Sequence, residues 1–327
     1  MKKQSKRLKW FWFAATPLLL GLALALVTRQ RAHRRVEAPL PDLHASSDPR
    51  EIERGRYLVT GPAHCGECHG ATTGPGQRRL DRPLSGGYAF DLPVGRFFVP
   101  NITPDVQTGI GRYSDPELAR LLRYGIKPDG TLALPFMPYA NLCDADLVAI
   151  LSYLRTLPAE HHVVPEHDIN VLGTFALAYL VEPKGPTEPL RENLTPEANA
   201  EYGRYLANDV GNCVMCHTKL DERTGAFAGP HFGGGGLHPS EANPEVVFVS
   251  PNLTPDPRWG WLEGWSEDTF FGRFRGGRVY EDSPMPWEAY QRLTETDLRA
   301  IYRYLKTLPP AVGGPDPQQR EVHLAGR

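Results

Sequence analysis

The stretch ERGRYLVTGPAHCGECHG at residues 53–70 recurs 148 residues later as EYGRYLANDVGNCVMCHT at residues 201–218. Two shorter strings recur in the same order: PNITPD (100–105) as PNLTPD (251–256), and YLRTLP (153–158) as YLKTLP (304–309). Ordered self-similarity of this kind indicates a duplicated structural unit. We call residues 51–158 copy 1 and residues 199–310 copy 2, and we expect each to fold as a domain.

Each copy has the pattern of a helical unit. In copy 1 the segment REIERGRYLV (50–59) leads into the first cysteine, and Ser114 and Glu117 stand in capping-box spacing before a helix that ends at Gly125. The last helix of each copy shows one apolar stripe. Its members are Leu147, Ile150, Leu151 and Leu154 in copy 1 and Leu298, Ile301, Tyr302 and Leu305 in copy 2. No sustained apolar/polar alternation indicates a β-sheet.

Outside the copies, three segments remain. Residues 1–35 form a basic and apolar leader, residues 159–198 a linker, and residues 311–327 a tail rich in Gly, Pro and Gln that we expect to be mobile. The linker holds one apolar patch, INVLGTFALAYLV (169–181). At 13 residues it is too short for a membrane span, which favours a helix packed on a domain surface.

The leader contains the uncharged run WFWFAATPLLLGLALALV (10–27) between basic flanks. Eighteen helical residues extend about 27 Å, enough for one bilayer crossing. A cleaved signal peptide is the alternative, but its best small-x-small site, Ala23-Leu24-Ala25, lies inside the run rather than after it. We therefore expect an uncleaved anchor at residues 10–27 and an exported body on the periplasmic side of a bacterial inner membrane.

The formal net charge of −2 conceals an uneven distribution. Residues 1–35 carry nine Lys and Arg and no acid, which leaves 27 basic and 38 acidic residues in the body. An acidic body argues against nucleic-acid binding, which favours basic faces. It suits solubility and a basic docking partner.

Four of the five cysteines lie in two C-x-x-C-H strings, CGECH (65–69) and CVMCH (213–217). This string is the attachment motif of c-type haem. A zinc ribbon would separate its C-x-x-C pairs by about 15–20 residues, and a thioredoxin-like pair would need a βαβ setting. The pattern therefore predicts two covalently bound haem c groups, attached through Cys65, Cys68, Cys213 and Cys216 and ligated by His69 and His217.

Two of the four methionines stand beside prolines: Met137 in PFMPY (135–139) and Met285 in SPMPW (283–287). Each lies 68 residues after the histidine of its own C-x-x-C-H string. A core methionine is normally a flexible filler on a helical stripe, whereas proline stiffens a loop. Met/His ligation is the cytochrome c arrangement and raises the reduction potential. We predict that Met137 and Met285 are the second axial ligands.

Both copies resemble class I cytochrome c domains, with a helix before C-x-x-C-H, a Met-bearing loop and a C-terminal helix. In that family the first and last helices cross, often with a glycine against an aromatic ring, which implies Gly55 with Tyr153 and Gly203 with Tyr304. The pattern PNITPD…TGIG…S (100–114) with MPY, DL and YLRTLP is similar to the cytochrome subunits of periplasmic alcohol and gluconate dehydrogenases. Those subunits usually carry three C-x-x-C-H motifs, and this chain has two. The resemblance covers nearly all of 51–310. It implies a mainly α fold of two tandem class I cytochrome c-like domains behind an N-terminal transmembrane anchor or signal segment.

Other residues invite a functional interpretation. Cys143 follows Met137 by six residues and has no counterpart in copy 2, where Leu293 and Thr294 flank the equivalent position. A sulfur site is one interpretation and a small buried hydrophobe the favoured one. The loop histidines are further candidates for iron or another metal, although ordinary loop positions are the more common case. They are His64, His161, His162, His231 and His238.

Two classes of function are compatible with this pattern. The first is electron transfer by a non-enzymatic dihaem carrier, between a dehydrogenase or quinol-oxidising complex and a terminal acceptor such as an oxidase. The second is a dihaem redox enzyme, a peroxidase or sulfur-compound dehydrogenase, and a haem gas sensor would share its need for one open iron. A methionine candidate in both copies favours the carrier.

Overall fold

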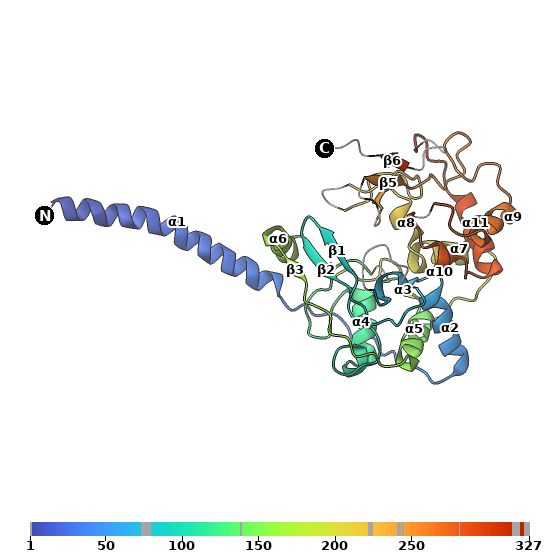
Figure 1. Ribbon diagram of the computed structural model, residues 1–327, viewed down its shortest axis with the longest axis horizontal. Helices are drawn as coiled ribbons and strands as arrows, with labels where there is room; N and C mark the ends of the chain where they lie inside the picture. The colour runs from blue at the N-terminus through green and yellow to red at the C-terminus, as the bar shows by residue number, and fades with distance from the viewer. Residues whose placement is uncertain are drawn as a thin grey trace.

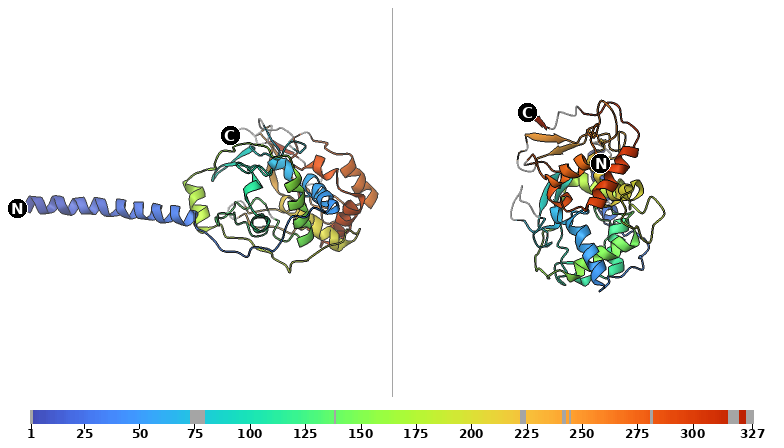
Figure 2. Two further views of the ribbon diagram at one scale, coloured as in Figure 1. Left: turned by 90° about the horizontal axis from the view of Figure 1, so that it is seen from below. Right: turned by 90° about the vertical axis from the view of Figure 1, so that its right-hand side faces the viewer.

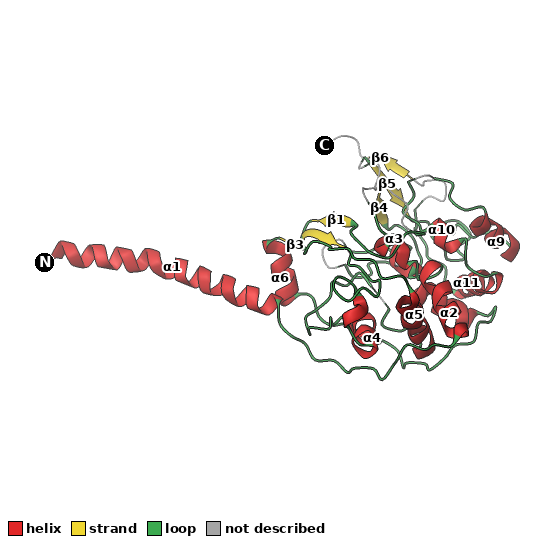
Figure 3. Cartoon of the chain, turned by 60° about the horizontal axis from the view of Figure 1, so that its bottom comes forward, coloured by secondary structure: helices red, strands yellow, loops and turns green. Residues whose placement is uncertain are grey.

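The computed structural model describes residues 2–72, 80–137, 139–221, 225–240, 243, 245–280, 282–315 and 321–323, without the side chains of 2–15 and 321–323. The fold is mainly helical with two small sheets, which confirms the predicted class (Figures 1 and 3). The helices are α1 (Lys2–Ala32), α2 (Pro49–Thr60), α3 (Cys65–His69), α4 (Asp115–Tyr124), α5 (Asp144–Thr156), α6 (Val171–Tyr179), α7 (Ala200–Tyr205), α8 (Cys213–Cys216), α9 (Glu267–Arg275), α10 (Trp287–Tyr290) and α11 (Glu295–Thr307). Two further helical turns are η1 (Ile110–Arg112) and η2 (Leu206–Val210). The strands are β1 (Ala89–Leu92), β2 (Gly95–Phe98), β3 (Asp168–Ile169), β4 (Leu237–Pro239), β5 (Val246–Val249) and β6 (Glu321–His323).

Two crossing helix pairs frame the body. In copy 1 α2 packs against α5, and in copy 2 α7 packs against α11. A Cβ on Gly55 would lie 1.8 Å from the carbonyl oxygen of Ala149, and a Cβ on Gly203 would lie 1.9 Å from that of Ala300. Only glycine allows two helix backbones to approach this closely. The expected crossing of the first and last helices is therefore present in both copies.

The aromatic partners of these glycines differ between the copies. Gly55 also faces the Cβ of Tyr153, as the resemblance implies. The nearest atoms to Gly203 belong instead to the backbone of Ala300 and Ile301. Tyr304 instead packs edge-on against Phe232, with ring centroids 5.8 Å apart.

The expected helix ends and stripes are confirmed. Ser114 and Glu117 form a complete capping box at the start of α4, and Gly125 ends that helix with a left-handed φ of 65°. All four stripe residues of α5 are buried. In α11 three of the four are buried, and Tyr302 is half-buried because its hydroxyl reaches the carbonyl oxygen of Trp265.

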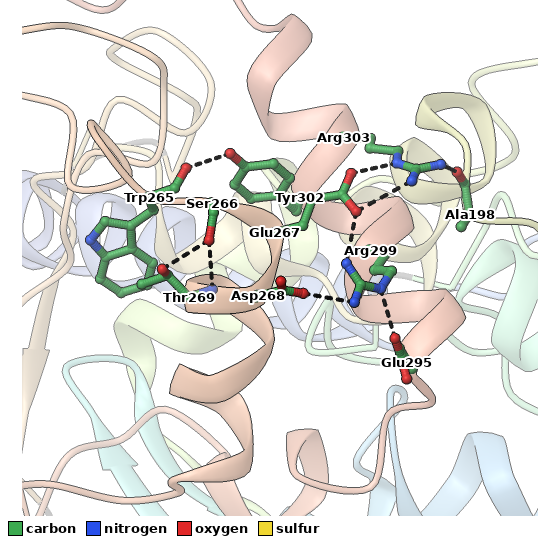
Figure 4. A network of polar contacts seen from close by, with 10 residues as sticks. All are labelled: Ala198, Trp265, Ser266, Glu267, Asp268, Thr269, Glu295, Arg299, Tyr302 and Arg303. Carbon is green, nitrogen blue, oxygen red and sulfur yellow. Dashed lines mark hydrogen bonds and ion pairs between the residues drawn. The ribbon is translucent and has the colours of Figure 1, made fainter.

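Ion pairs hold α9 onto α11 (Figure 4). Arg299 on α11 bridges Glu267 and Asp268 in the first turn of α9, at 2.9 and 2.8 Å. Arg303 binds Glu267 from the next turn of α11, at 2.6 Å. Acidic residues also favour the positive end of a helix dipole, so these pairs fix the start of α9 as well as its position.

The copies meet through a reciprocal exchange of hydrogen bonds. Tyr57 on α2 of copy 1 donates its hydroxyl to Asp297 on α11 of copy 2, and Tyr205 of copy 2 donates to Asp146 on α5 of copy 1. Buried apolar residues of both copies form one continuous core around these contacts. The domain boundaries at 51–158 and 199–310 remain a prediction.

The structure adds two three-stranded antiparallel sheets, β1-β2-β3 and β4-β5-β6, which the sequence pattern did not indicate. Their strands have two to four residues, too few for a visible alternation. The third strand of each sheet comes from outside the copies. Linker residues Asp168–Ile169 pair with β2, and Glu321–His323 of the expected mobile tail pair with β5.

The N-terminal helix α1 projects away from the body, and α6 of the linker lies across its inner end (Figures 1 and 2). This agrees with a linker helix that packs on the surface. Among the residues described, no helix is long and apolar enough to span a membrane. The side chains of residues 10–15, the first third of the expected anchor, lie outside the described part of the chain.

Candidate haem-binding sites

Both C-x-x-C-H strings begin in one-turn helices, α3 in copy 1 and α8 in copy 2. The residue before each first cysteine, His64 or Asn212, has a left-handed backbone with φ of 39° or 51°. This kink turns the chain abruptly into the helical turn. Side chains at positions i and i+3 lie on one helix face, so the spacing presents both thiols of each string to the same side.

The two histidines are oriented alike. His69 and His217 are only 8% and 7% exposed, and their Nδ1 atoms lie 2.9 Å and 3.0 Å from the carbonyl oxygens of Pro100 and Pro251. A carbonyl oxygen can only accept, so Nδ1 carries the proton and donates it. Burial lowers the pKa of His69, and it lowers the pKa of His217 to about 4, so both rings are neutral at pH 7. Nε2 is then left with a free lone pair, which fits a haem iron.

Two prolines that follow these histidines, Pro75 and Pro230, stand at different offsets from His69 and His217, so the sequence alone indicates neither as a carbonyl acceptor. The structure assigns the role to Pro100 and Pro251, the first residues of the repeated PNITPD and PNLTPD strings. Pro75 itself lies outside the described residues.

An asparagine holds each of these carbonyl segments. Asn101 accepts hydrogen bonds from the N–H and hydroxyl of Thr103, at 2.9 and 2.7 Å, and donates to the carbonyl oxygen of Glu160 at 2.8 Å. Asn252 does the same with Thr254 and with the carbonyl oxygen of Ala311. Both asparagines are buried, and the turn that each forms explains the sequence motif.

In copy 1 the methionine loop is fixed on both sides of Met137. The ring of Phe136 packs edge-on against Phe90 of the β1–β2 hairpin, with centroids 5.1 Å apart. The hydroxyl of Tyr139 donates to the carbonyl oxygen of Ala63, 2.8 Å away and two residues before Cys65. Met137 is half-buried between these two contacts. Pro138, expected to stiffen the loop, lies outside the described residues.

In copy 2 the loop around Met285 has an equivalent attachment. The hydroxyl of Tyr290 donates to the carbonyl oxygen of Gly211, 2.7 Å away and two residues before Cys213. The backbone also turns at the methionine, because the N–H of Trp287 donates to its carbonyl oxygen at 2.8 Å. In each copy, a tyrosine just after the methionine thus binds the chain just before the first cysteine.

The sequence repeats include these asparagines and tyrosines, but the sequence alone did not indicate their contacts. PNxTPD recurs with a buried asparagine, and each methionine is followed by a tyrosine, two residues later in copy 1 and five in copy 2. The different offsets concealed the equivalence of Tyr139 and Tyr290. Burial raises the pKa of both phenols well above its usual value, which keeps them as neutral donors.

Cys143 is a buried residue at a helix start. It precedes α5 as Thr294 precedes α11, so it does have a counterpart in copy 2. The backbone N–H groups of Cys143 and Thr294 both donate to a tyrosine hydroxyl of the other copy, at 3.3 and 3.0 Å. Cys143 is 1% exposed, and burial raises the pKa of its thiol. These surroundings favour the small buried hydrophobe over a sulfur site.

The loop histidines have other partners. His64 packs edge-on against Tyr290, His161 lies 3.7 Å from Asp105, and the Nδ1 atom of His162 lies 2.8 Å from the carbonyl oxygen of Ser85. His231 packs against Phe227, and His238 lies 3.2 Å from the carbonyl oxygen of Cys216. Within the described part of the chain, no group of three or more His, Cys, Asp or Glu could hold a separate metal ion.

Comparison with known proteins finds relatives of this chain, although no protein-family model matches it. The chain is 30% identical over 317 residues to "Diheme cytochrome c-type" of Cereibacter sphaeroides, which covers 89% of this chain and 98% of that protein. It is 30% identical over 330 residues to the cytochrome c subunit of alcohol dehydrogenase (quinone) of Gluconacetobacter polyoxogenes, covering 92% of this chain and 61% of that one. It is 29% identical over 293 residues to the cytochrome subunit of fructose dehydrogenase of Gluconobacter japonicus, covering 83% of this chain and 55% of that one. The chain thus spans less than two thirds of the length of the dehydrogenase subunits that it matches.

The helical fold and the two C-x-x-C-H sites define a c-type cytochrome. The chain belongs to the cytochrome c family that includes the Cereibacter sphaeroides protein and the alcohol dehydrogenase subunit. The resemblance to cytochrome c subunits of alcohol, fructose and gluconate dehydrogenases is thereby confirmed. Covalent haem c and electron transfer follow from this membership.

Proposed function

We propose that this chain carries two haem c groups and passes electrons between a dehydrogenase, or a quinol-oxidising complex, and a terminal acceptor. The observation that carries the proposal is the identical orientation of His69 and His217 by the carbonyl oxygens of Pro100 and Pro251. Each copy thus repeats one orientation of its histidine. The relative named as a diheme cytochrome supports the number two.

The proposed ligand set follows the duplication. Cys65 and Cys68 hold one haem, and Cys213 and Cys216 hold the other. His69 with Met137, and His217 with Met285, complete the two pairs of axial ligands. When bound, haem supplies reversible one-electron chemistry. The chain's own part is to fix the ligands, which Tyr139 and Tyr290 do by attaching each methionine loop to the segment before its first cysteine.

Electron transfer is favoured over catalysis because the two candidate haem sites are alike. A peroxidase, a sulfur-compound dehydrogenase or a gas sensor needs one open or weakly ligated iron. Both loops around Met137 and Met285 are fixed in equivalent ways. The sulfur alternative rested on Cys143, which is buried against Tyr205 and Asp146.

The partner and location are proposed from the relatives and the leader sequence. The names of several relatives describe cytochrome c subunits of dehydrogenases, so a dehydrogenase is the proposed electron donor. Haem attachment to C-x-x-C-H and the leader run 10–27 suit a body on the periplasmic side of a bacterial inner membrane, tethered through α1. The 18 uncharged residues of that run support the tether.

The test is the absorption spectrum of the reduced protein before and after addition of carbon monoxide. The protein is produced in a host that attaches c-type haem. We expect c-type haem bands, two haems per chain, and no change with carbon monoxide, because both irons are fully ligated. A shift in about half of the haem would favour the enzyme or sensor, and a chain without haem bands would contradict the whole proposal.

A further inference from the structure

The linker helix α6 is apolar and lies on the surface. Its nine residues, VLGTFALAY, include no charged side chain. Val171, Leu172 and Phe175 are 87%, 57% and 48% exposed, and Leu180 just beyond the helix is 69% exposed. An apolar patch of this kind on a soluble body is unusual unless something covers it.

The position of α6 is fixed relative to α1. The hydroxyls of Thr28 on α1 and Tyr179 on α6 lie 3.1 Å apart, and the guanidinium of Arg31 lies 4.9 Å from the centre of the Tyr179 ring. Arg34 donates to the carbonyl oxygens of Leu177, Ala178 and Val181 at 2.8–2.9 Å. These bonds satisfy the unpaired carbonyls at the end of α6 and tie the two helices together.

The contact with Thr28 also fixes the level of α6 along the axis of α1. Thr28 directly follows Val27, the last residue of the uncharged run 10–27. At about 1.5 Å per residue, Tyr179 therefore lies within one helical turn of the end of that run. Tyrosine is enriched at this level of a membrane protein, where its ring is apolar and its hydroxyl polar.

The orientation of α6 also suits a position at the membrane surface. In two perpendicular views α6 lies crosswise at the edge of the body from which α1 projects (Figures 1 and 2). Its buried side, Gly173, sits on the carbonyl oxygen of Val94 in the β1–β2 turn, so the helix is mounted on copy 1. A helix that lies across a membrane-crossing helix at this level is parallel to the membrane surface.

The charges near α6 are those that a bilayer surface favours. Arg29, Arg31 and Arg35 are exposed at the same end of α1. Basic residues beside an interfacial helix add electrostatic attraction to anionic lipid headgroups. A protein partner that covered α6 would not require these arginines and the uncharged helix to lie at the same level of α1.

We infer that α6 is an interfacial helix whose exposed side, Val171, Leu172 and Phe175, enters the headgroup region of the bilayer and holds copy 1 against the membrane. This rests on the proposed tether through α1, and not on the proposed electron transfer. The lipid contact would restrict how the body turns on its tether, so that copy 1 faces the membrane and copy 2 faces away.

The test uses nitroxide labels on the full-length haem-loaded protein in nanodiscs of phosphatidylethanolamine with a minor share of phosphatidylglycerol. Single cysteines replace Leu172 on α6, Leu22 on α1 and Val279 on copy 2. Cys143 is 1% exposed, so it does not compete for the label. Val279 is the matched control, because it is 68% exposed and follows α9, which lies on the side of the body away from α1 (Figure 1).

We expect the ratio of oxygen to nickel-chelate accessibility to be several-fold higher at position 172 than at position 279, and higher still at position 22. A label at 172 that matches 279, with 22 still in lipid, would overturn the interfacial helix and leave the tether intact. A label at 22 that matches 279 would overturn the tether and this inference with it. The carbon monoxide experiment is independent of all three labels.

A second variant gives an independent readout. In Leu172→Gln/Phe175→Gln the apolar side of α6 becomes polar, while the bonds of Arg34 are left in place. We expect the nickel-chelate accessibility of a label at a neighbouring site, Thr174→Cys, to rise several-fold, with the haem spectrum unchanged. An unchanged accessibility at 174 would count against lipid contact.

Discussion

The hydroxyl of Tyr205 in copy 2 donates a hydrogen bond to the carboxylate of Asp146 in copy 1, over 2.8 Å. The equivalent pair with exchanged copies is Tyr57 and Asp297. The carboxylate of Asp146 also accepts hydrogen bonds from Nε and Nη2 of Arg54, at 2.8 and 2.9 Å. Two copies of one unit therefore use the same side chains on both sides of their contact, which is how a self-complementary interface between identical subunits is built.

Removal of the Tyr205 hydroxyl should weaken this contact. Tyr205→Phe leaves the N–H of Cys143 without its acceptor and Asp146 with one donor fewer, in a buried place. We expect the free energy of unfolding to fall by about 1–3 kcal/mol, the cost of a buried unsatisfied polar group. Denaturant titration of the haem-loaded protein measures it.

Tyr280→Phe is the matched control, because Tyr280 is 42% exposed. A loss for Tyr205→Phe no greater than for this control would show that the exchange contributes nothing to stability.

The helix crossings should tolerate no side chain. In Gly55→Ala or Gly203→Ala the new Cβ would stand less than 2 Å from a backbone oxygen of the partner helix, so the helices must separate. We expect a loss of at least about 3 kcal/mol, at the upper end of the cost of overpacking. Gly272→Ala in α9, with no atom within 4 Å of the new Cβ, should instead stabilise the protein by up to about 1 kcal/mol. Similar thermal midpoints for Gly55→Ala and Gly272→Ala would contradict this geometry.

The sequence is sufficient for much of this fold because local signals and the repeat agree. The capping box at Ser114, the stop at Gly125 and the stripe of α5 are each set by neighbours within one element. The duplication then supplies the glycine at the helix crossing and the C-x-x-C-H string twice. The cysteine and histidine spacing is a local chemical requirement, so it can also be recognised without a structure.

The features that could not be predicted from the sequence depend on contacts between segments that lie far apart in the chain. Pro100 lies 31 residues after His69 and Pro251 lies 34 after His217, so neither spacing suggests a hydrogen bond. The sheets form because Asp168–Ile169 and Glu321–His323 return to short strands of the copies. The counterpart of Cys143 in copy 2 is a threonine, Thr294. The two can be matched only when the starts of α5 and α11 are aligned.

Stability should decrease in mild acid through His167. Its Nδ1 atom accepts a hydrogen bond from the N–H of Phe98 at 3.2 Å, and burial, then the charge of Lys127, lower its pKa below the ordinary 6.5. The unfolded chain therefore binds the proton more readily, so the stability due to neutral His167 is complete above pH 6.5 and is lost as the pH falls toward the folded-state pKa. His167→Asn keeps an acceptor and cannot titrate.

We therefore expect the free energy of unfolding to fall between pH 7 and 5 slightly more steeply in the natural protein than in His167→Asn, because His167 is exposed and solvent screens its charge. Parallel slopes in denaturant titrations at several pH values would mean that His167 does not titrate in this way.

Asn252 should act on the haem site through the carbonyl oxygen of Pro251. In Asn252→Ala the turn at Thr254 and the bond to Ala311 are both lost, so the acceptor of His217 becomes less fixed. We expect stability to fall by about 1–3 kcal/mol and the potential of one haem to change, because this hydrogen bond tunes ligand basicity. Asn193→Ala at an exposed position is the control. A stability loss with both potentials unchanged would confine Asn252 to a structural role.

The methionine loops provide the most direct test of the ligand set. In Met137→Ala or Met285→Ala one iron loses its thioether, the ligand that favours the reduced state, so its potential should fall by on the order of 0.1 V or more, within the roughly 0.8 V range set by axial ligands. About half of the haem should then bind carbon monoxide. Met215→Leu is the matched control, since Met215 lies between the cysteines of CVMCH and is 36% exposed. Potentiometric titration of the three variants resolves the outcome: a variant with both potentials unchanged would show that its methionine is not a ligand, and one altered potential in each alanine variant would assign the two ligands to their copies.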